Sequence, residues 1–158
     1  GGGVNQPPLG VHVQSQNLKK AFDRVYHEEL LYKLKQLKFS SKFVNILQSM
    51  YSDLTARVKS RKGLTKEFPV LIGTRQGCNL SSLLFNIYLN DLPSSLKCKD
   101  CDTVKIRDIE IKCLMYADNI VMFNKSEAGM NLYLKQLEEY CNEWRLTISV
   151  KKTKIFVI

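Results

Sequence analysis

The 158-residue sequence predicts an α+β fold, with helices packed on one face of an antiparallel sheet. Three observations support this prediction. Apolar residues recur every three or four positions in several segments, as they do on amphipathic helices. Other short runs are rich in β-branched and aromatic residues. Between two such runs lie residues 116–119, Tyr-Ala-Asp-Asn, which are typical of a tight hairpin because Asp and Asn tolerate positive φ.

Strands are expected at residues 11–16, 109–116, 120–123, 146–150 and 155–158. The segment from Arg57 to Lys66 predicts a separate basic hairpin, with Val58 and Leu64 as its apolar points. Taken alone, the 116–119 turn is an ordinary hairpin loop and indicates no function.

Four amphipathic helices are expected, and Ser126 is a suitable N-cap for the last of them. The last helix carries Tyr133, Tyr140 and Trp144, and we interpret this aromatic stripe as core. The apolar positions are Leu30, Leu31, Leu34 and Leu37; Phe43, Val44, Leu47, Met50 and Tyr51; Leu80, Leu83, Leu84, Ile87 and Tyr88; and Met130, Tyr133, Leu134, Leu137, Tyr140, Cys141 and Trp144.

The composition indicates one domain with an acidic partner. At 44% hydrophobic content, a chain of this length buries roughly 70% of the surface that its unfolded state exposes. The net charge of +9 favours a nucleic acid, although a solvated lysine-rich face is the alternative. The basic residues form three clusters: Lys19, Lys20 and Arg24; Arg57, Lys59, Arg61, Lys62 and Lys66; and Lys151, Lys152 and Lys154.

The cysteines and the hydropathy pattern add little about function. Cys98 and Cys101 have the spacing of a zinc-binding pair, but no second pair follows. Cys78, Cys113 and Cys141 lie in apolar surroundings and are expected to be buried and reduced. No apolar run is as long as a membrane span and no signal peptide is visible, so we expect neither secretion nor a membrane partner.

Three segments resemble motifs A, B and C of reverse transcriptases from non-LTR (LINE-like) retrotransposons. In chain order they are Asn-Leu-Lys-Lys-Ala-Phe-Asp at 17–23, Thr-Arg-Gln-Gly-Cys at 74–78 and Tyr-Ala-Asp-Asn at 116–119. The resemblance runs from about Val11 to Ile158, and residues 146–154 look like motif D. It implies a polymerase palm-like sheet with partial fingers and no thumb. Residues 1–10 are then expected to be a flexible leader, and 11–158 an incomplete reverse transcriptase domain.

The resemblance also implies the substrates, partners and location of the domain. The partners are an RNA template, a DNA primer and a deoxynucleotide triphosphate, and the location is intracellular, either nuclear or cytoplasmic. In the family, two Mg²⁺ ions support nucleotidyl transfer, as in other two-metal sites. On this basis, nucleic-acid binding is expected at Lys19, Lys20, Arg57, Lys59, Arg61 and Lys62.

Two positions depart from the family pattern at the metal-binding acids. The family reads Asp-x-x-x-Ala-Phe-Asp in motif A and Tyr-Ala-Asp-Asp in motif C, so Asn17 and Asn119 replace aspartates. Of the three metal positions, only Asp118 keeps its carboxylate. In the family pattern, the acid at the position of Asp23 lies outside the metal shell, so Asp23 is expected to serve structure. Mg²⁺ prefers anionic oxygen, so its binding is expected to be weakened or lost. Further departures are Asn79-Leu80-Ser81-Ser82, where the family has Pro-Leu-Ser-Pro, and Ser149 in place of the motif D asparagine.

Individual roles also follow from the resemblance. The expected catalytic positions are Asp118, Asn119, Asn17 and Lys152, the last as a general acid for the leaving pyrophosphate. The expected nucleotide-binding positions are Phe22, Arg75, Gln76, Gly77 and Tyr116, with Phe22 excluding a 2′ hydroxyl. The alternatives without a functional role are a core aromatic for Phe22 and solvated side chains for Arg75 and Lys152. Three functions stay open: an RNA-directed DNA polymerase domain, a non-catalytic remnant that binds nucleic acid, and an unselected relic of a retrotransposon.

Overall fold

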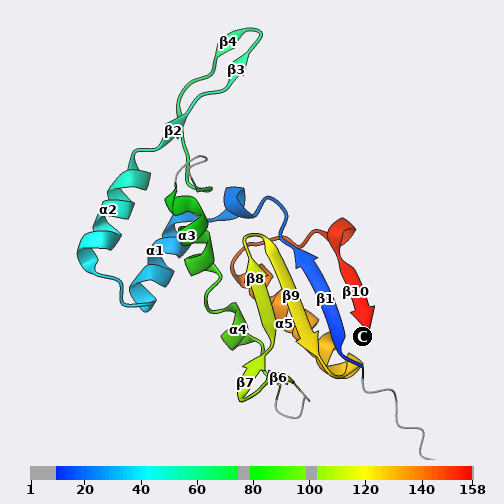
Figure 1. Cartoon of the computed structure of the whole chain (residues 1–158). Coiled ribbons are helices and arrows are strands. Elements are labelled where there is room, and N and C mark those ends of the chain that lie inside the picture. Colours follow the sequence, from blue (N-terminus) through cyan, green and yellow to red (C-terminus); the bar gives the residue numbers. More distant parts are fainter. Residues whose placement is uncertain (1–9, 75–78, 99–102, 158) are drawn as a thin grey trace, which may run out of the picture. The chain divides into compact units, whose positions relative to one another are not determined.

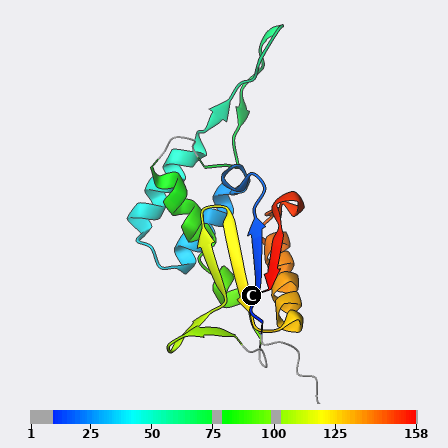
Figure 2. The ribbon, with the colours of Figure 1, turned by 45° about the vertical axis from the view of Figure 1, so that its right-hand side comes forward.

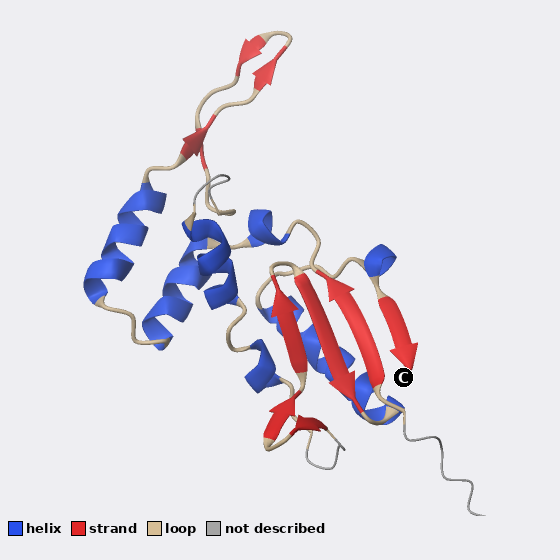
Figure 3. Ribbon diagram, viewed as in Figure 1, coloured by secondary structure: helices blue, strands red, loops and turns tan. Residues whose placement is uncertain are grey.

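The structure is a computed structural model and describes residues 10–74, 79–98 and 103–157. The chain folds into two compact units, one formed by Gly1–Lys19 with Asp91–Ile158 and the other by Lys20–Asn90. Both units mix helices with antiparallel strand pairs, which confirms the predicted α+β class (Figure 3). Among the described residues, no helix is both long enough and apolar enough to cross a membrane.

A four-stranded antiparallel sheet forms the centre of the first unit. Its order is β10 (Lys154–Val157), β1 (His12–Asn17), β9 (Asn119–Asn124) and β8 (Cys113–Tyr116) (Figure 1). These strands confirm the predictions for residues 11–16 and 120–123, and that for 155–158 as far as Val157, the last described residue. The predicted strand at 109–116 is divided: β7 (Ile109–Ile111) pairs with β6 (Val104–Ile106) in a separate hairpin, and only β8 joins the sheet.

The prediction of a strand at residues 146–150 is wrong. This segment makes one isolated bridge, between Leu18 and Ile148, and then forms a 3-10 turn at Val150–Lys152. The physical reason is that β10 occupies the edge of β1 from His12 to Ser15. The segment therefore bonds only near the end of β1, where the Ser149 amide donates to the Asn17 carbonyl over 2.7 Å.

The strand register sorts the side chains of the sheet onto two faces. Gln14 pairs with Met122 and Gln16 with Ile120, and all four are buried on one face. Helix α5 (Glu127–Glu143) lies against one face of the sheet (Figures 1 and 2). The short helix α4 (Leu92–Ser95) belongs to the same unit and contacts α5. The buried positions of α5 confirm most of the predicted stripe: Met130, Tyr133, Leu137, Tyr140 and Cys141.

The N-terminus of α5 is capped as predicted. The Ser126 hydroxyl accepts a hydrogen bond from the Gly129 amide at 3.1 Å. The side-chain oxygen of Asn124, which is fully buried, accepts from both the amide and the hydroxyl of Ser126. The end of β9 and the start of α5 are thus fixed by one hydrogen-bonded group.

Three helices form the core of the second unit. They are α1 (His27–Gln36), α2 (Ser41–Ser52) and α3 (Leu80–Tyr88), as the apolar spacing predicts. Short strands β2 (Thr55–Ala56) and β5 (Phe68–Pro69) pair, and beyond them β3 (Lys59–Ser60) and β4 (Gly63–Leu64) form the predicted basic hairpin (Figure 1). The buried core residues are Leu30, Leu34, Val44, Leu47, Leu84, Phe85 and Tyr88.

Candidate functional site

Strand pairing brings the Asn17 and Asp118 segments together at one end of the sheet. Tyr116 pairs with Asn119, so Ala117 and Asp118 form a two-residue turn between β8 and β9. Ala117 has a φ of 51°, a left-handed conformation that is uncommon for a residue with a Cβ. Asn17, the last residue of β1, pairs with Asn119. The Leu18 amide also donates to the Asp118 carbonyl over 2.8 Å.

The three side chains form a hydrogen-bonded cluster. The Asn17 amide nitrogen donates to Asp118 Oδ2 at 2.7 Å and to Asn119 Oδ1 at 3.1 Å. The Asn119 amide nitrogen contacts Asp118 Oδ1 at 3.4 Å. Asn17 is 7% exposed, so its amide is largely shielded from water. Both carboxylate oxygens of Asp118 therefore face neutral N–H donors.

A magnesium pair does not suit these residues. Mg²⁺ prefers anionic oxygens in octahedral geometry, and this cluster offers one carboxylate whose oxygens already accept amide hydrogens. Within residues 10–74, 79–98 and 103–157, no three His, Cys, Asp or Glu side chains are grouped as a metal site requires. Weakened Mg²⁺ binding by this chain stays a prediction.

The cluster lines a cavity of about 510 Å³, and lysine side chains line it as well. Lys152, predicted from motif D, lies on the 3-10 turn at Val150–Lys152 and lines the cavity. Its complete lining is Ser15, Asn17, Asp118, Asn119, Lys151, Lys152 and Lys154. The four residues expected to be catalytic thus surround one space. Ser15 was not singled out in the sequence, although it is two residues before Asn17 and therefore shares its strand face.

The positions expected to bind a nucleotide are only partly described. Tyr116 is 84% exposed beside Asn119, on the first unit. Phe22 belongs to the 3-10 turn η1 (Ala21–Arg24) of the second unit, where its partly exposed ring lies 4.9 Å from the ring of Phe85. Arg75, Gln76 and Gly77 lie outside the described residues, and so does the predicted phosphate loop before α3.

The residues just before that loop are held by hydrogen bonds within the second unit. The Thr74 amide donates to the Phe22 carbonyl at 2.8 Å, and the Gly73 amide donates to the Val25 carbonyl at 2.8 Å. The buried His27 donates from Nε2 to the Gly73 carbonyl at 2.8 Å, and its ring stacks on Tyr51. The second half of the motif A segment therefore fixes the start of the motif B segment.

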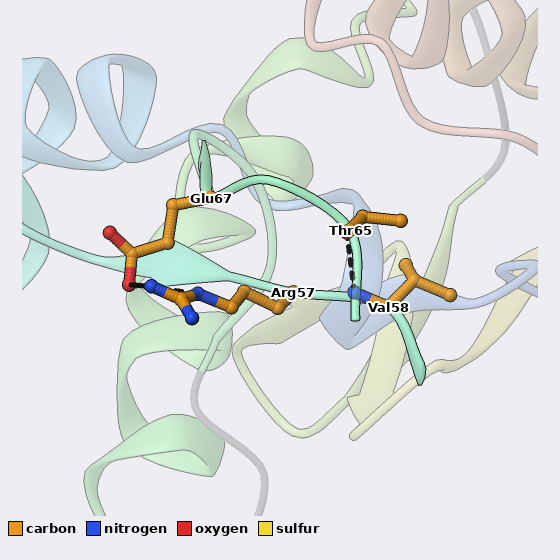
Figure 4. Close-up of polar contacts among 4 residues, drawn as sticks. All are labelled: Arg57, Val58, Thr65 and Glu67. Carbon is orange, nitrogen blue, oxygen red and sulfur yellow. Dashed lines mark hydrogen bonds and ion pairs between the residues drawn. The ribbon is translucent and has the colours of Figure 1, made fainter. Parts of the chain in front are cut away.

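The basic hairpin is solvent-exposed along its whole length. Near its base, an ion pair of 3.0 Å joins Arg57 to Glu67, and the Val58 amide donates to the Thr65 hydroxyl at 2.9 Å (Figure 4). Val58 and Leu64 are more than half exposed, so the hairpin is shaped by backbone bonds and not by an apolar core. Its exposed cations are Lys59, Arg61, Lys62 and Lys66. Lys19 and Lys20, beside motif A, are exposed as well.

Two described cysteines have the small apolar role that the sequence predicts. Burial raises the pKa of the Cys113 thiol to about 11 and that of the Cys141 thiol to about 12. Cys141 is buried, as predicted, whereas Cys113 is only partly buried. Such raised pKa values keep both thiols protonated near neutral pH, which is unfavourable for a nucleophile. Cys78 and Cys101 lie outside the described residues.

Comparison with known proteins relates the chain to reverse transcriptases. The family model "Reverse transcriptase (RNA-dependent DNA polymerase)" matches residues 4–157. The chain is 29% identical over 145 residues to "Probable RNA-directed DNA polymerase from transposon BS" of Drosophila melanogaster, covering 87% of this chain and 15% of that protein. It is 25% identical over 142 residues to "RNA-directed DNA polymerase from mobile element jockey" of the same species, covering 86% and 15%.

A further relative and a solved structure also match the chain. The chain is 25% identical over 143 residues to "Retrovirus-related Pol polyprotein from type-1 retrotransposable element R2" of Popillia japonica, covering 90% of this chain and 20% of that one. The chain therefore spans about a fifth or less of these relatives. Apo telomerase from Candida tropicalis matches with a TM-score of 0.70 at 14% identity, covering 98% of this chain and 32% of the telomerase chain. At that identity, the likeness concerns the fold.

Proposed function

The chain belongs to the reverse transcriptase family, and from this premise we propose that it is part of an RNA-directed DNA polymerase with impaired catalysis and retained nucleic-acid binding. Its relatives include polymerases of the BS, jockey and R2 elements, as the motif resemblance to non-LTR retrotransposons predicts. We also propose that residues 11–158 form the incomplete palm-like domain, and that a longer polypeptide supplies the remaining subdomains.

The observation that carries the proposal is the hydrogen bond from Asn17 to Asp118. In a two-metal site, carboxylates hold the cations that activate the primer hydroxyl and neutralise the triphosphate. Here amides occupy two of those positions, and Asn17 donates a hydrogen where a cation would be bound. Loss of one preorganised electrostatic contact lowers a rate by about 10²- to 10³-fold, and two are changed here.

Retained nucleic-acid binding is supported by the exposed cations. Lys59, Arg61 and Lys62 lie on a hairpin with no apolar core, where they can reach a phosphate backbone. Phosphate contacts of this kind release counterions, so the affinity falls steeply with salt. We assign the RNA template and DNA primer to this basic surface. From the motif resemblance alone, we assign the nucleotide to Phe22, Arg75, Gln76, Gly77 and Tyr116.

Primer extension by a charge-restored variant tests the catalytic part of the proposal. Asn17→Asp/Asn119→Asp restores the acids, and Asn86→Asp/Asn131→Asp changes the charge equally at two exposed helical positions. With Mg²⁺, an RNA template, a DNA primer and a deoxynucleotide, we expect extension by the restored variant at least about 100-fold faster than by the natural chain or the control. Extension by the natural chain at the rate of the restored variant contradicts impairment.

Metal binding is measured separately, because the missing subdomains could limit extension. We expect Mg²⁺ to raise the melting temperature of the restored variant and to leave the natural chain and the control unchanged. Binding of a labelled RNA/DNA duplex at two salt concentrations then tests the second part. Salt-sensitive binding without Mg²⁺ supports retained binding, and no binding at low salt contradicts it.

A further inference from the structure

The cavity beside Asp118 has the charge of an anion site. Its lining carries three ammonium groups, from Lys151, Lys152 and Lys154, and one carboxylate, from Asp118, so three positive charges minus one give a net charge of +2. Within the described part of the chain, none of these lysines forms an ion pair with an acid. With aspartates at positions 17 and 119, the same lining would be neutral. The two asparagines therefore change the net charge of the cavity from zero to positive.

The backbone that carries these lysines is fixed to β1. Ser149 donates its amide to the Asn17 carbonyl at 2.7 Å, just before the turn. After the turn, the Thr153 hydroxyl donates to the Gln16 side chain at 2.7 Å. Lys154 then pairs with Ser15 in the β1–β10 register. The three ammonium groups thus project from an anchored segment, which lowers the entropy lost when they converge on one ligand.

The single carboxylate is already satisfied by neutral donors. Asp118 accepts from Asn17 at 2.7 Å and contacts the Asn119 amide at 3.4 Å. Among the described residues no ion pair joins the three lysines to this carboxylate, so their ammonium groups are left to bind an anion from solution. Ser15 adds a hydroxyl, which can donate to an anionic oxygen.

We propose that this cavity binds a phosphate group directly through Lys151, Lys152 and Lys154, without a divalent cation. This proposal rests on the proposed function, in which the metal site is impaired. Phosphate is then the ligand of the altered site. Lysine binds phosphate as a point charge, and several ammonium groups around a cavity suit a multiply charged phosphate. The phosphate comes either from a free polyphosphate or triphosphate, or from a nucleic-acid backbone.

The test measures binding in EDTA with three probes: inorganic tripolyphosphate, deoxythymidine triphosphate, and a single-stranded DNA oligonucleotide without terminal phosphates. For at least one probe, we expect Lys152→Ala/Lys154→Ala to weaken binding about tenfold or more, since two charges near the ligand are removed. Lys125→Ala/Lys135→Ala removes two exposed lysines of the same unit outside the cavity and is expected to have little effect. The probe that loses affinity identifies the source of the phosphate.

A variant that neutralises the cavity provides the second measurement. Asn17→Asp/Asn119→Asp makes the lining neutral with little change in shape. It is therefore expected to lower phosphate affinity in EDTA by about tenfold, compared with Asn86→Asp/Asn131→Asp. Binding that requires Mg²⁺, equal losses in both lysine variants, or no binding of any probe would each overturn the phosphate site.

The two proposals fail in different ways. If the natural chain binds no phosphate in EDTA and also extends no primer, the phosphate site is wrong and the impairment stands. If the natural chain extends a primer with Mg²⁺ as fast as the restored variant, the proposed function fails whatever the probes do in EDTA.

Discussion

The Asn17 amide nitrogen lies 2.7 Å from Asp118 Oδ2 and links the end of β1 to the β8–β9 turn by a hydrogen bond. A carboxylate at position 17 would instead face Asp118 as a like charge. The asparagine therefore stabilises the cluster without a cation, and the aspartate of the family pattern requires one. Replacing Asn17 by the aspartate of the family pattern is therefore predicted to exchange this hydrogen bond for a contact between two like charges.

The single variant Asn17→Asp tests this relationship. In EDTA we expect it to lower the free energy of unfolding by about 1–3 kcal/mol, because a hydrogen bond is lost and two carboxylates meet at a partly buried position. Mg²⁺ should recover part of this loss. Urea unfolding with EDTA and with Mg²⁺ measures both effects, and Asn131→Asp is the control at an exposed helical position. Equal stability of the variant and the natural chain in EDTA would contradict the account.

The tight contact between Gly129 and Asn124 leads to a second prediction. A Cβ on Gly129 would lie 2.3 Å from Asn124 Oδ1, which already accepts from Ser126. Since Asn124 is fully buried, Gly129→Ala is expected to lower stability by about 2 kcal/mol or more in urea unfolding. The exposed neighbour Ala128 supplies the control, and Ala128→Gly should cost about 1 kcal/mol or less. A neutral Gly129→Ala would show that the Asn124 side chain can move aside.

The thiols of Cys113 and Cys141 are expected to make stability fall at alkaline pH. The thiols of Cys113 and Cys141 have raised pKa values of about 11 and about 12, against an ordinary value of 9.0. Their stabilising effect is complete below pH 9. It is lost as pH rises toward the folded pKa values, because the unfolded thiols release protons first.

The measurement compares pH 8 with pH 10. Between these values, the natural chain should lose about 1 kcal/mol per thiol more than Cys113→Ala/Cys141→Ala does, as judged by urea unfolding. Lysine titration is common to both proteins and cancels in the difference. Identical pH profiles would mean that the two thiols ionise alike in the folded and unfolded chains.

Periodicity was sufficient to predict α1, α2, α3 and α5, but neither the short α4 nor every strand. Leu30, Leu34, Leu47 and Leu84 all recur at helical spacing and are buried. Residues 146–150 have the apolar character of a strand, yet β10 already occupies the edge of β1 that they would need. Which of two candidate segments takes an edge depends on pairing between distant residues, and local pattern does not contain that information.

The candidate site, too, could be predicted from the sequence only in part. The motif resemblance predicted that Asn17, Asp118, Asn119 and Lys152 belong together, and they line one cavity. Lys154 enters the lining because it pairs with Ser15 across the β1–β10 register. That register could not be read from the spacing of the lysines, so the positive charge of the cavity became visible only in the fold.

The Arg57–Glu67 ion pair in the basic hairpin gives the last prediction (Figure 4). Both side chains are about half exposed, so the pair should contribute less than about 1 kcal/mol to stability. Its larger effect is on charge, since Glu67 neutralises one cation of the surface assigned to nucleic acid. Glu67→Gln should therefore raise affinity for an RNA/DNA duplex several-fold at low salt and increase the salt slope by about 1. The control is Glu110→Gln, which makes the same change of charge at an exposed position of β7. Equal gains in affinity for both variants would mean that only the net charge of the chain matters, and not the position of Glu67.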